Sequence, residues 1–316
     1  MQKNLALELW EKHRQELALE NLLVIADEND IFRPSAAPAG SAVVFLPKSK
    51  ALIDMTLALV SGMVLENRKI VLAGEKSAGI ESAKKAFEKN IGPVEQKIVG
   101  NHSALYVGKN KKLGADKKIE DFLSYSPISY KDAQIEIANL PGVFSAGELD
   151  EGTRLLLDHI PYDKKKMLDV GCGSGVIGTI YKKKNQASEV LMSDRSKLAV
   201  MAARKTLEAN KLSAKVMESD VFENIKGKFD LIVSNPPFHR GVDTDYSFIE
   251  NFARGAKQHL KRDGKAYVVA NSFLPYGKVL KKFFEKTDIL ADDGKFKIYR
   301  SSQPRKTVPT RGKTGL

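Results

Sequence analysis

The sequence has 316 residues, more than one domain usually contains, and its apolar fraction of 42% is enough for two hydrophobic cores. No apolar run approaches the roughly 20 residues needed to cross a bilayer, and the first twenty residues resemble an amphipathic helix rather than a secretory signal, so we expect a cytoplasmic protein. A single cysteine excludes an intrachain disulfide, and the scattered histidines lack metal-ligand spacing, so we expect no metal. The net charge of +12 fits either a nucleic-acid partner or a solvated, lysine-rich surface.

Apolar runs rich in Val and Ile alternate with helical patterns along the chain, which indicates an α/β protein with a mainly parallel sheet. The elements predicted in the first half are a helix in 1–20, strands at 43–47 and 69–73, and helices at 51–65 and around 83–87. A polar stretch at 109–118 ends this half, and residues 130–140 alternate like a strand that opens the second half. We place the boundary near Ser126, which gives domains at 1–125 and 126–302 and a flexible basic tail at 303–316.

The second half follows the same plan as the first. Its predicted elements are a strand at 231–233, a helix at 248–260, a strand at 265–270 and a helix ending near 284. The spacing from the later strand to the end of the next helix is sixteen residues in both halves, 71–87 and 268–284, which favours an ancestral duplication. The first half lacks a glycine-rich loop and has Leu-Pro-Lys-Ser at 46–49 where the second has Asn-Pro-Pro-Phe at 235–238. We therefore predict that the first domain is catalytically silent and serves as support or for RNA docking.

A glycine-rich turn, Gly171-Cys172-Gly173-Ser174-Gly175, follows the short apolar strand 167–170 and precedes a predicted helix. Glycines allow backbone N–H groups to approach a ligand closely, and the helix N-terminus adds a positive field. Residues 173–178 also spell G-x-G-x-x-G, and Asp194 lies about twenty residues further on, as the dinucleotide fingerprint requires. Taken alone, this region fits a nicotinamide enzyme as well as an S-adenosylmethionine-dependent methyltransferase.

Two further carboxylates favour the methyltransferase. Asp169 precedes the first glycine at the end of the strand, where it can hold the ammonium group of the cofactor directly or through water. Asp220, followed by Val221, lies where a third strand should end, so its carboxylate can accept from an adenine amino group. Asp220 taken by itself fits a turn or cap residue better than a cofactor contact. Cys172 is a small residue within the loop and is not interpreted as a nucleophile.

The deciding motif is Asn235-Pro236-Pro237-Phe238, directly after the strand 231–233. The two prolines cannot donate backbone hydrogen bonds, so they end the strand rigidly at the sheet edge that faces the ligand crevice. The Asn235 side-chain oxygen and the Pro236 carbonyl can both accept hydrogens from a target NH₂ group and orient its lone pair toward the methyl group. Phe238 offers a face for stacking a planar base, worth about 1–3 kcal/mol. His239 is either a substrate contact or a surface imidazole.

These blocks together resemble the bacterial small-subunit ribosomal RNA guanine-N2 methyltransferases of the RsmC type. The blocks are 140–145, 149–150, 169–176, 235–239, 269–276 and 294–300, with 46–50 and 74–79 in the first half. The match runs from about Leu22 to Arg300. It implies two tandem Rossmann-like class I methyltransferase domains, of which only the second binds cofactor, with a mainly parallel sheet and an antiparallel C-terminal strand.

The resemblance also implies a reaction and a set of site residues. The expected reaction is transfer of a methyl group from S-adenosylmethionine to N2 of one guanine in 16S rRNA of the small ribosomal subunit, by a monomer without metal or membrane. The cofactor would contact Asp169, Gly171, Cys172, Gly173, Asp194, Asp220, Val221 and Asn235, with Phe144 and Ser145 at the entrance. The target base would contact Asn235, Pro236, Pro237, Phe238 and His239, with Asn235, Pro236 and Phe238 as the catalytic residues.

Two other functions stay open on the sequence alone. N-P-P-[FY] turns also occur in adenine-N6 and protein-glutamine methyltransferases. Phe238 and the excess of basic over acidic residues favour RNA as the substrate. A non-catalytic RNA-binding assembly factor with a vestigial cofactor fold is the other alternative, and the intact Asp169 and Asn235 argue against it. The lysine runs at 109–112 and 182–184 lie outside the family pattern, so a role in RNA binding depends on their charge alone.

Overall fold

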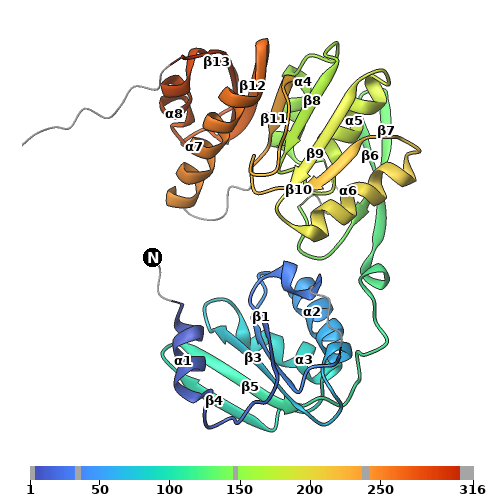
Figure 1. The fold of residues 1–316 in the computed structure, drawn as a ribbon, viewed down its shortest axis with the longest axis vertical. Coiled ribbons are helices and arrows are strands. Elements are labelled where there is room, and N and C mark those ends of the chain that lie inside the picture. The colour runs from blue at the N-terminus through green and yellow to red at the C-terminus, as the bar shows by residue number, and fades with distance from the viewer. Residues whose placement is uncertain (1–3, 33–36, 145–148, 237–241, 307–316) are drawn as a thin grey trace, which may run out of the picture. The chain divides into compact units, whose positions relative to one another are not determined.

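The computed structural model describes residues 4–32, 37–144, 149–236 and 242–306. The chain divides into two compact units, Met1–Leu123 with Leu140–Gly142, and Ser124–Asn139 with Val143–Leu316. Each unit has its own sheet and its own helices (Figure 1). Within the described residues, no helix combines the length and the apolar character that a membrane span requires.

The second unit is built on a seven-stranded sheet in the order β10-β9-β8-β11-β12-β14-β13. Its strands are β8 (Lys166–Val170), β9 (Glu189–Asp194), β10 (Lys215–Glu218), β11 (Phe229–Ser234), β12 (Leu260–Asn271), β13 (Phe284–Asp292) and β14 (Phe296–Pro304). The five strands from β10 to β12 in this order pair in parallel, whereas β14 runs antiparallel to both β12 and β13. The predicted α/β fold with an antiparallel C-terminal strand is thereby confirmed.

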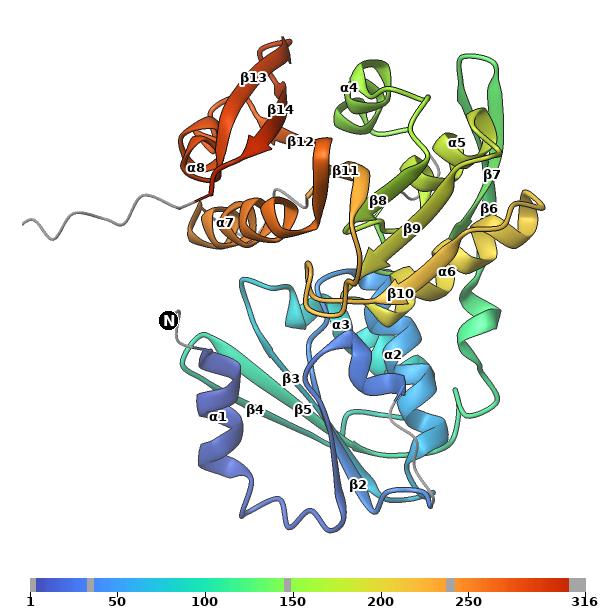
Figure 2. The ribbon, with the colours of Figure 1, turned by 45° about the horizontal axis from the view of Figure 1, so that its top comes forward.

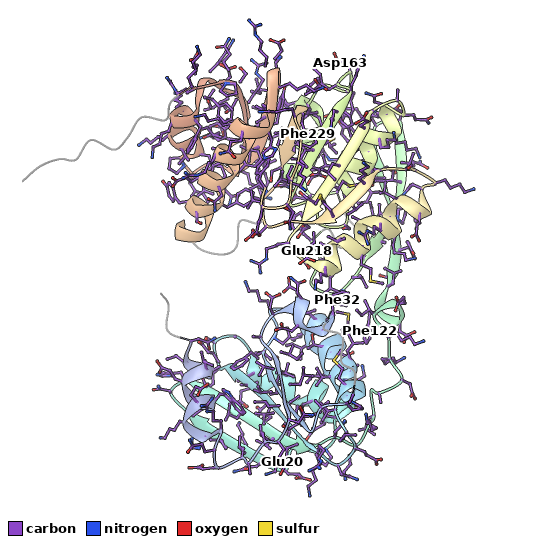
Figure 3. The ribbon with its side chains drawn as sticks, viewed as in Figure 1. Glu20, Phe32, Phe122, Asp163, Glu218 and Phe229 are labelled. Atoms are coloured by element: carbon purple, nitrogen blue, oxygen red, sulfur yellow. The ribbon has the colours of Figure 1, made fainter. Side chains whose placement is uncertain are left out.

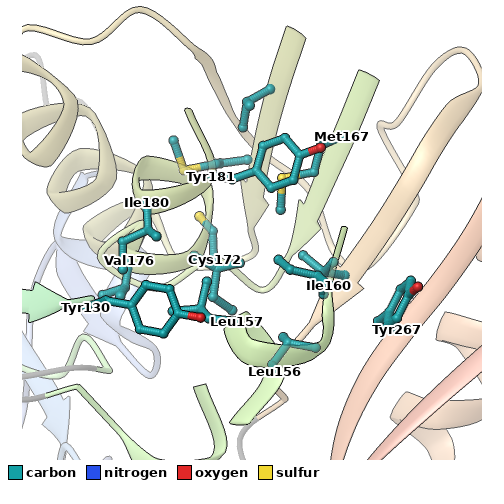
Figure 4. Close-up of a cluster of buried hydrophobic side chains, with 14 of the residues drawn as sticks. Tyr130, Leu156, Leu157, Ile160, Met167, Cys172, Val176, Ile180, Tyr181 and Tyr267 are labelled. Carbon is teal, nitrogen blue, oxygen red and sulfur yellow. The ribbon is translucent and has the colours of Figure 1, made fainter. Parts of the chain in front are cut away.

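Two cores cover the two faces of this sheet, because successive side chains of a strand point to opposite faces. Met167 of β8 packs with α4 (Glu151–His159), α5 (Val176–Lys184) and α6 (Lys197–Ala209). The next residue, Leu168, packs with α7 (Val242–His259) and α8 (Tyr276–Phe283) on the other face. Figure 4 shows part of the first core, in which buried side chains such as Leu157 and Ile180 lie around Cys172.

A hairpin of β6 (Ser124–Tyr130) and β7 (Ala133–Asn139) packs against α5 and α6. Its free edge is held by side chains of α6 and its C-cap: the Asn210 amide exchanges hydrogen bonds of 3.0 and 2.7 Å with the backbone of Glu136. The strand predicted at 130–140 is present as β7, but it begins only at Ala133, because the chain reverses at Lys131, whose φ is +51°, and Tyr130 ends the preceding strand β6. All of β6, including the predicted boundary residue Ser126, belongs to the second unit.

The ends of two predicted elements also differ. The first helix, α1, spans Leu5–His13 rather than all of 1–20. Strand β14 extends to Pro304, which pairs with Phe284, so the strand includes two residues that were expected in the tail. Residues 307–316 of the predicted tail lie outside the described part of the chain.

The first unit repeats the plan of the second with fewer elements. Its strands are β1 (Leu22–Ile25), β2 (Ser41–Phe45), β3 (Lys69–Glu75), β4 (Gln96–Gly100) and β5 (Ser103–Lys109), and its other helices are α2 (Lys50–Met63) and α3 (Ile80–Asn90). Figure 2 shows α1 beside β4 and β5, and its Leu9 and Trp10 are buried. In the order β1-β2-β3-β5-β4, strand β5 runs antiparallel to both of its neighbours. This sheet matches β8-β11-β12-β14-β13 in the direction of each strand and in the order in which the strands follow along the chain. This shared topology supports the duplication, and the first unit has no described counterpart of α5, β9, α6 and β10.

Candidate active site

The strands β8 to β11 end at one edge of the second sheet. Figure 3 shows Asp163, which precedes β8, and Glu218, which ends β10, at opposite ends of this unit. The register pairs Val170 with Ser193 and Glu218 with Asp194, so the strands end nearly level. The residues that follow them therefore meet at the edge where parallel α/β sheets bind ligands.

The glycine-rich turn after β8 forms an open cradle at this edge. The backbone N–H groups of Gly171 and Cys172 both donate to the Ser193 carbonyl, at 2.8 and 2.9 Å. Gly171 has a φ of +72°, and a Cβ atom there would meet nothing within 4 Å. The space beside this backbone is therefore free, as a site for a closely approaching ligand requires. The turn leads into α5, whose N-terminus adds a positive field.

Asp169, the carboxylate before this turn, is completely buried. Its Oδ2 accepts from the Gly178 N–H of α5 at 3.1 Å, and its Oδ1 has no hydrogen-bond partner among the described residues. Burial raises the pKa of Asp169 to about 7, the Gly178 N–H offsets part of this rise, and the nearby charge of Asp194 adds to it. A buried carboxylate with one unpartnered oxygen is suited to hold a cationic group such as an ammonium.

Asp194, at the end of β9, links two loops at the same edge. Its Oδ2 accepts from the Gly173 N–H at 3.0 Å and its Oδ1 from the Ser196 N–H at 2.9 Å. Burial raises the pKa of Asp194, and the backbone N–H groups of Ser196 and Gly173 partly offset this effect. A carboxylate has about four acceptor positions, so Asp194 can accept from a ribose hydroxyl in addition to these backbone groups.

Asp220 and Val221 lie in the turn after β10, next to β9. The Ser219 N–H donates to the Asp194 carbonyl at 2.9 Å, which brings this turn beside Asp194. Asp220 is exposed, and Val221 has a φ of +48°. A β-branched residue in this region is strained, and such strain is found most often at ligand sites.

Asn235 directly follows β11 and is only 8% exposed. The register pairs Asp169 with Val233, so Asn235 lies one strand across and two residues further on, on the same face of the sheet. Its Nδ2 donates to Asp150 Oδ2 at 2.9 Å and to Thr153 Oγ1 at 2.7 Å. Its Oδ1 is buried and has no hydrogen-bond partner among the described residues. The residue after it, Pro236, is buried, whereas Pro237, Phe238 and His239 lie outside the described part of the chain.

The remaining predicted site residues lie around the glycine-rich turn. Phe144 is 51% exposed, and its carbonyl accepts from the Ser174 hydroxyl at 2.9 Å. Ser145 lies outside the described residues. The Cys172 side chain is buried in the core shown in Figure 4, and burial raises the pKa of its thiol well above the usual value. The thiol is therefore protonated, which agrees with its not being a nucleophile.

Sequence reasoning missed Asp150 and Thr153 as site residues. Asp150 is the N-cap of α4, and its Oδ2 also accepts from the Thr153 N–H at 2.8 Å. The Asp-x-x-Thr spacing at 150–153 is a recognisable helix start, but nothing in it indicates a contact with residue 235. Only the packing of α4 against the sheet brings the two segments together.

The lysine runs have structural roles in addition to their charge. Lys182 Nζ donates to the carbonyls of Gln186 and Ser188, both at 2.6 Å, and Lys184 Nζ pairs with Asp132 of the β6–β7 turn. In the first unit, Lys111 Nζ donates to Asn67 Oδ1 at 2.9 Å. These contacts give the lysines partners within the protein, but the neutral oxygens bonded to Lys182 and Lys111 leave their positive charge in place.

Comparisons with known proteins agree with this geometry. The methyltransferase small domain model matches residues 134–300, and the model of its N-terminal domain matches residues 32–125. A protein of Aeromonas hydrophila named ribosomal RNA small subunit methyltransferase C is 35% identical over 89% of this chain and 87% of its own length. A protein of the same name from Haemophilus influenzae strain Rd is 39% identical over 81% of this chain and 77% of its own length.

One solved structure has the same fold across both units. The 16S rRNA N2 methyltransferase (RsmC) of T. thermophilus, in complex with AdoMet and guanosine, superposes with a TM-score of 0.75 at 24% identity. The match covers 86% of this chain and 75% of that one. The antiparallel β14 between β12 and β13 also differs from the order 3-2-1-4-5-6 of a dinucleotide-binding sheet, which argues against the nicotinamide alternative. The chain belongs to the methyltransferase small domain family and, within it, to the ribosomal RNA small subunit methyltransferases C.

Proposed function

We propose that this protein transfers a methyl group from S-adenosylmethionine to the exocyclic N2 of a guanine in 16S rRNA of the small ribosomal subunit. The observation that supports this most directly is Asn235, a buried amide whose Oδ1 has no partner among the described residues. It lies at the strand-end edge that also holds Asp169 and Asp194. The names of the relatives and of the similar structure point to the same reaction.

The residues at this edge fit the cofactor. The unpartnered Asp169 Oδ1 would hold its ammonium group, and the free space beside Gly171 would receive its methionine part. Asp194 would accept from the ribose, and Asp220 with Val221 would bind the adenine. When bound, the cofactor supplies an electrophilic methyl carbon, so the chain itself need only orient the nucleophile.

The exocyclic amine of a base is a poor nucleophile because its lone pair is delocalised into the ring. Asn235 Oδ1 and the Pro236 carbonyl would accept its two hydrogens, which favours a pyramidal nitrogen and stabilises the positive charge that develops there. The proton can leave after the transfer, so this step needs no strong base. Phe238 would stack on the guanine, and a paired guanine would first have to be flipped out.

The first unit serves in this proposal as a catalytically silent support or RNA-docking domain. Its β1 is followed by a short 3₁₀ segment, Glu28–Phe32, in place of a glycine-rich loop. It also lacks described counterparts of β9 and β10, the strands that place Asp194 and Asp220 in the second unit. We further propose that the protein acts as a cytoplasmic monomer on assembled small subunits.

The proposal is tested with labelled cofactor and small subunits from a strain that lacks the enzyme. We expect label in 16S rRNA, with mass spectrometry locating N2-methylguanosine at one position. Label on an adenine or on a ribosomal protein would instead support the other N-methyltransferase alternative. Absence of cofactor binding in calorimetry would support a non-catalytic assembly factor.

A further inference from the structure

We propose that Asp150 and Thr153 are positioning residues that fix which end of the Asn235 amide faces the substrate. This inference rests on the proposed function, because it concerns the group that would accept the target amine. Asn235 Nδ2 contacts both residues, at 2.9 Å to Asp150 Oδ2 and 2.7 Å to Thr153 Oγ1. Neither contact was expected from the sequence, since 85 and 82 residues separate the partners.

The chemistry of Asp150 determines the direction of this contact. An ionised carboxylate can only accept hydrogen bonds, so the atom of the amide that faces it must be the NH₂ group. Turning the amide over would place Oδ1 against the carboxylate, which replaces an attractive contact by repulsion between two oxygens. The Thr153 hydroxyl accepts the second N–H hydrogen, so both donors are used within the protein. Oδ1 is therefore left as a pure acceptor, the group that a target amine requires.

The clamp formed by Asp150 and Thr153 is itself held rigidly. Asp150 Oδ2 also accepts from the Thr153 N–H at 2.8 Å and caps α4, so one oxygen joins the helix start to Asn235. Gly152 lies between the two clamp residues, and a Cβ atom there would come within 3.1 Å of Val269 Cγ1 and 3.3 Å of Phe296 Cδ1. The start of α4 thus packs closely against β12 and β14. This contact fixes the distance between the clamp and the end of β11.

The negative charge of Asp150 adds to the effect of geometry. A hydrogen bond from Nδ2 to a carboxylate polarises the amide and increases the negative charge on its Oδ1. A more negative Oδ1 is a stronger acceptor for an amine that becomes positive in the transition state. Loss of the clamp should therefore lower the rate of transfer and leave cofactor binding, which depends on β8, β9 and β10, unchanged.

The test uses single-turnover methylation of small subunits by the full chain. We expect Asp150→Asn, which retains a good N-cap, to slow transfer about tenfold, the factor associated with one hydrogen bond to a charged group. Thr153→Val removes a hydrogen bond between two neutral groups and should slow transfer about fivefold. Thr153→Ser should restore most of the rate lost in Thr153→Val. Glu151→Gln is the matched control, because it removes one adjacent charge, which pairs with exposed Lys295, and its rate should stay within about twofold of the parent.

A second measurement separates positioning from a structural role. In an Asn235→Ala background, Asp150→Asn should cause no further loss of rate, because the clamped group is already gone. An equal loss in both backgrounds, or an equal loss of cofactor affinity, would show that Asp150 acts only as a helix cap. If the parent protein methylates a guanine and Asn235→Ala does not, whereas both clamp variants are fully active, the clamp is refuted and the proposed function stands.

Discussion

Two buried oxygen atoms at the strand-end edge, Asp169 Oδ1 and Asn235 Oδ1, have unused hydrogen-bonding capacity within the described residues. A buried polar atom without a partner costs about 1–3 kcal/mol, and a bound ligand that forms a hydrogen bond to it would recover this cost. One oxygen belongs to an acid suited to a cation and the other to a neutral acceptor suited to an amine. Their neighbouring strands place both on one face of the sheet, as transfer between two bound molecules requires.

Replacing Asn235 by Ala removes the proposed acceptor and leaves the cofactor cradle intact. We expect single-turnover methylation to fall by about 10²–10³-fold, the loss typical of one preorganised transition-state contact. The cofactor dissociation constant, measured by calorimetry, should stay within about twofold of the parent value. Equal loss of rate and cofactor affinity would show instead that this turn is structural.

The raised pKa of Asp169 leads us to expect that cofactor binding depends on pH. Its pKa of about 7 in the free protein means that below pH 7 the carboxyl group must lose a proton before it can pair with an ammonium ion. Cofactor affinity should therefore rise with pH up to about 7, by at most about tenfold per unit, and then level off. Below pH 7, calorimetry in buffers of different ionisation enthalpy should detect proton release on binding.

The variant Asp169→Asn provides the comparison for this measurement. It should bind the cofactor weakly and with little dependence on pH in the same range. In the absence of cofactor, the raised pKa means that the folded parent binds a proton more tightly than the unfolded chain. Ionisation of Asp169 should thus lower folding stability as pH rises from about 4 to 7. Cofactor affinity that stays flat from pH 5.5 to 7.5 in the parent protein would contradict this assignment.

At the scale of elements, α7 supports the turn after β10. Phe222, which follows Val221, stacks on His259 with ring centroids 5.3 Å apart and packs on α7 at Gly255. A Cβ atom at residue 255 would lie 2.1 Å from Phe222 Cδ2. The turn proposed to bind adenine thus depends on the close approach of α7, a helix that comes later in the chain, after β11.

Gly255→Ala is therefore expected to displace Phe222. Overpacking of this kind costs about 1–3 kcal/mol, which would lower the melting temperature of the second unit by several degrees. Cofactor affinity should fall with it because the turn at 220–221 moves. Asn251→Ala, an exposed change on the same helix, is the control and should leave both quantities close to the parent. If Gly255→Ala lowers stability but leaves cofactor affinity normal, the turn at 220–221 is not part of the cofactor site.

For the whole molecule, the net charge of +12 is a property that no single element explains. Binding to 16S rRNA should weaken steeply with salt, because each phosphate that is neutralised releases counterions. With six or more such contacts, the association constant should fall about a thousandfold between about 50 and 200 mM salt. Cofactor affinity, measured alongside, should change little. A weak dependence of the association constant on salt, measured by filter binding or fluorescence titration, would show instead that the positive charges lie on a solvated surface and do not contact RNA.

Local sequence determined much of this protein. The turn 171–175, the prolines after Asn235 and the alternation of apolar runs with helical patterns predicted the fold class and the edge at which the site lies, because turn chemistry and periodicity depend on neighbouring residues. The family was predicted from the resemblance of whole sequence blocks, such as 140–145 and 235–239, to a known family. The family and the fold are confirmed by the comparisons and the sheet order. The roles of the individual site residues stay predictions.

Only the tertiary structure decided which polar atoms have hydrogen-bond partners within the protein and which have none. The orientation of the Asn235 amide depends on Asp150 and Thr153, and the partners of Lys182 and Lys184 depend on the loop after α5 and on the β6–β7 hairpin. The reversal at Lys131 depends on the packing of that hairpin on α6. Hydrogen bonds between distant segments form only once helices pack on the sheet, and no local pattern of residues records them.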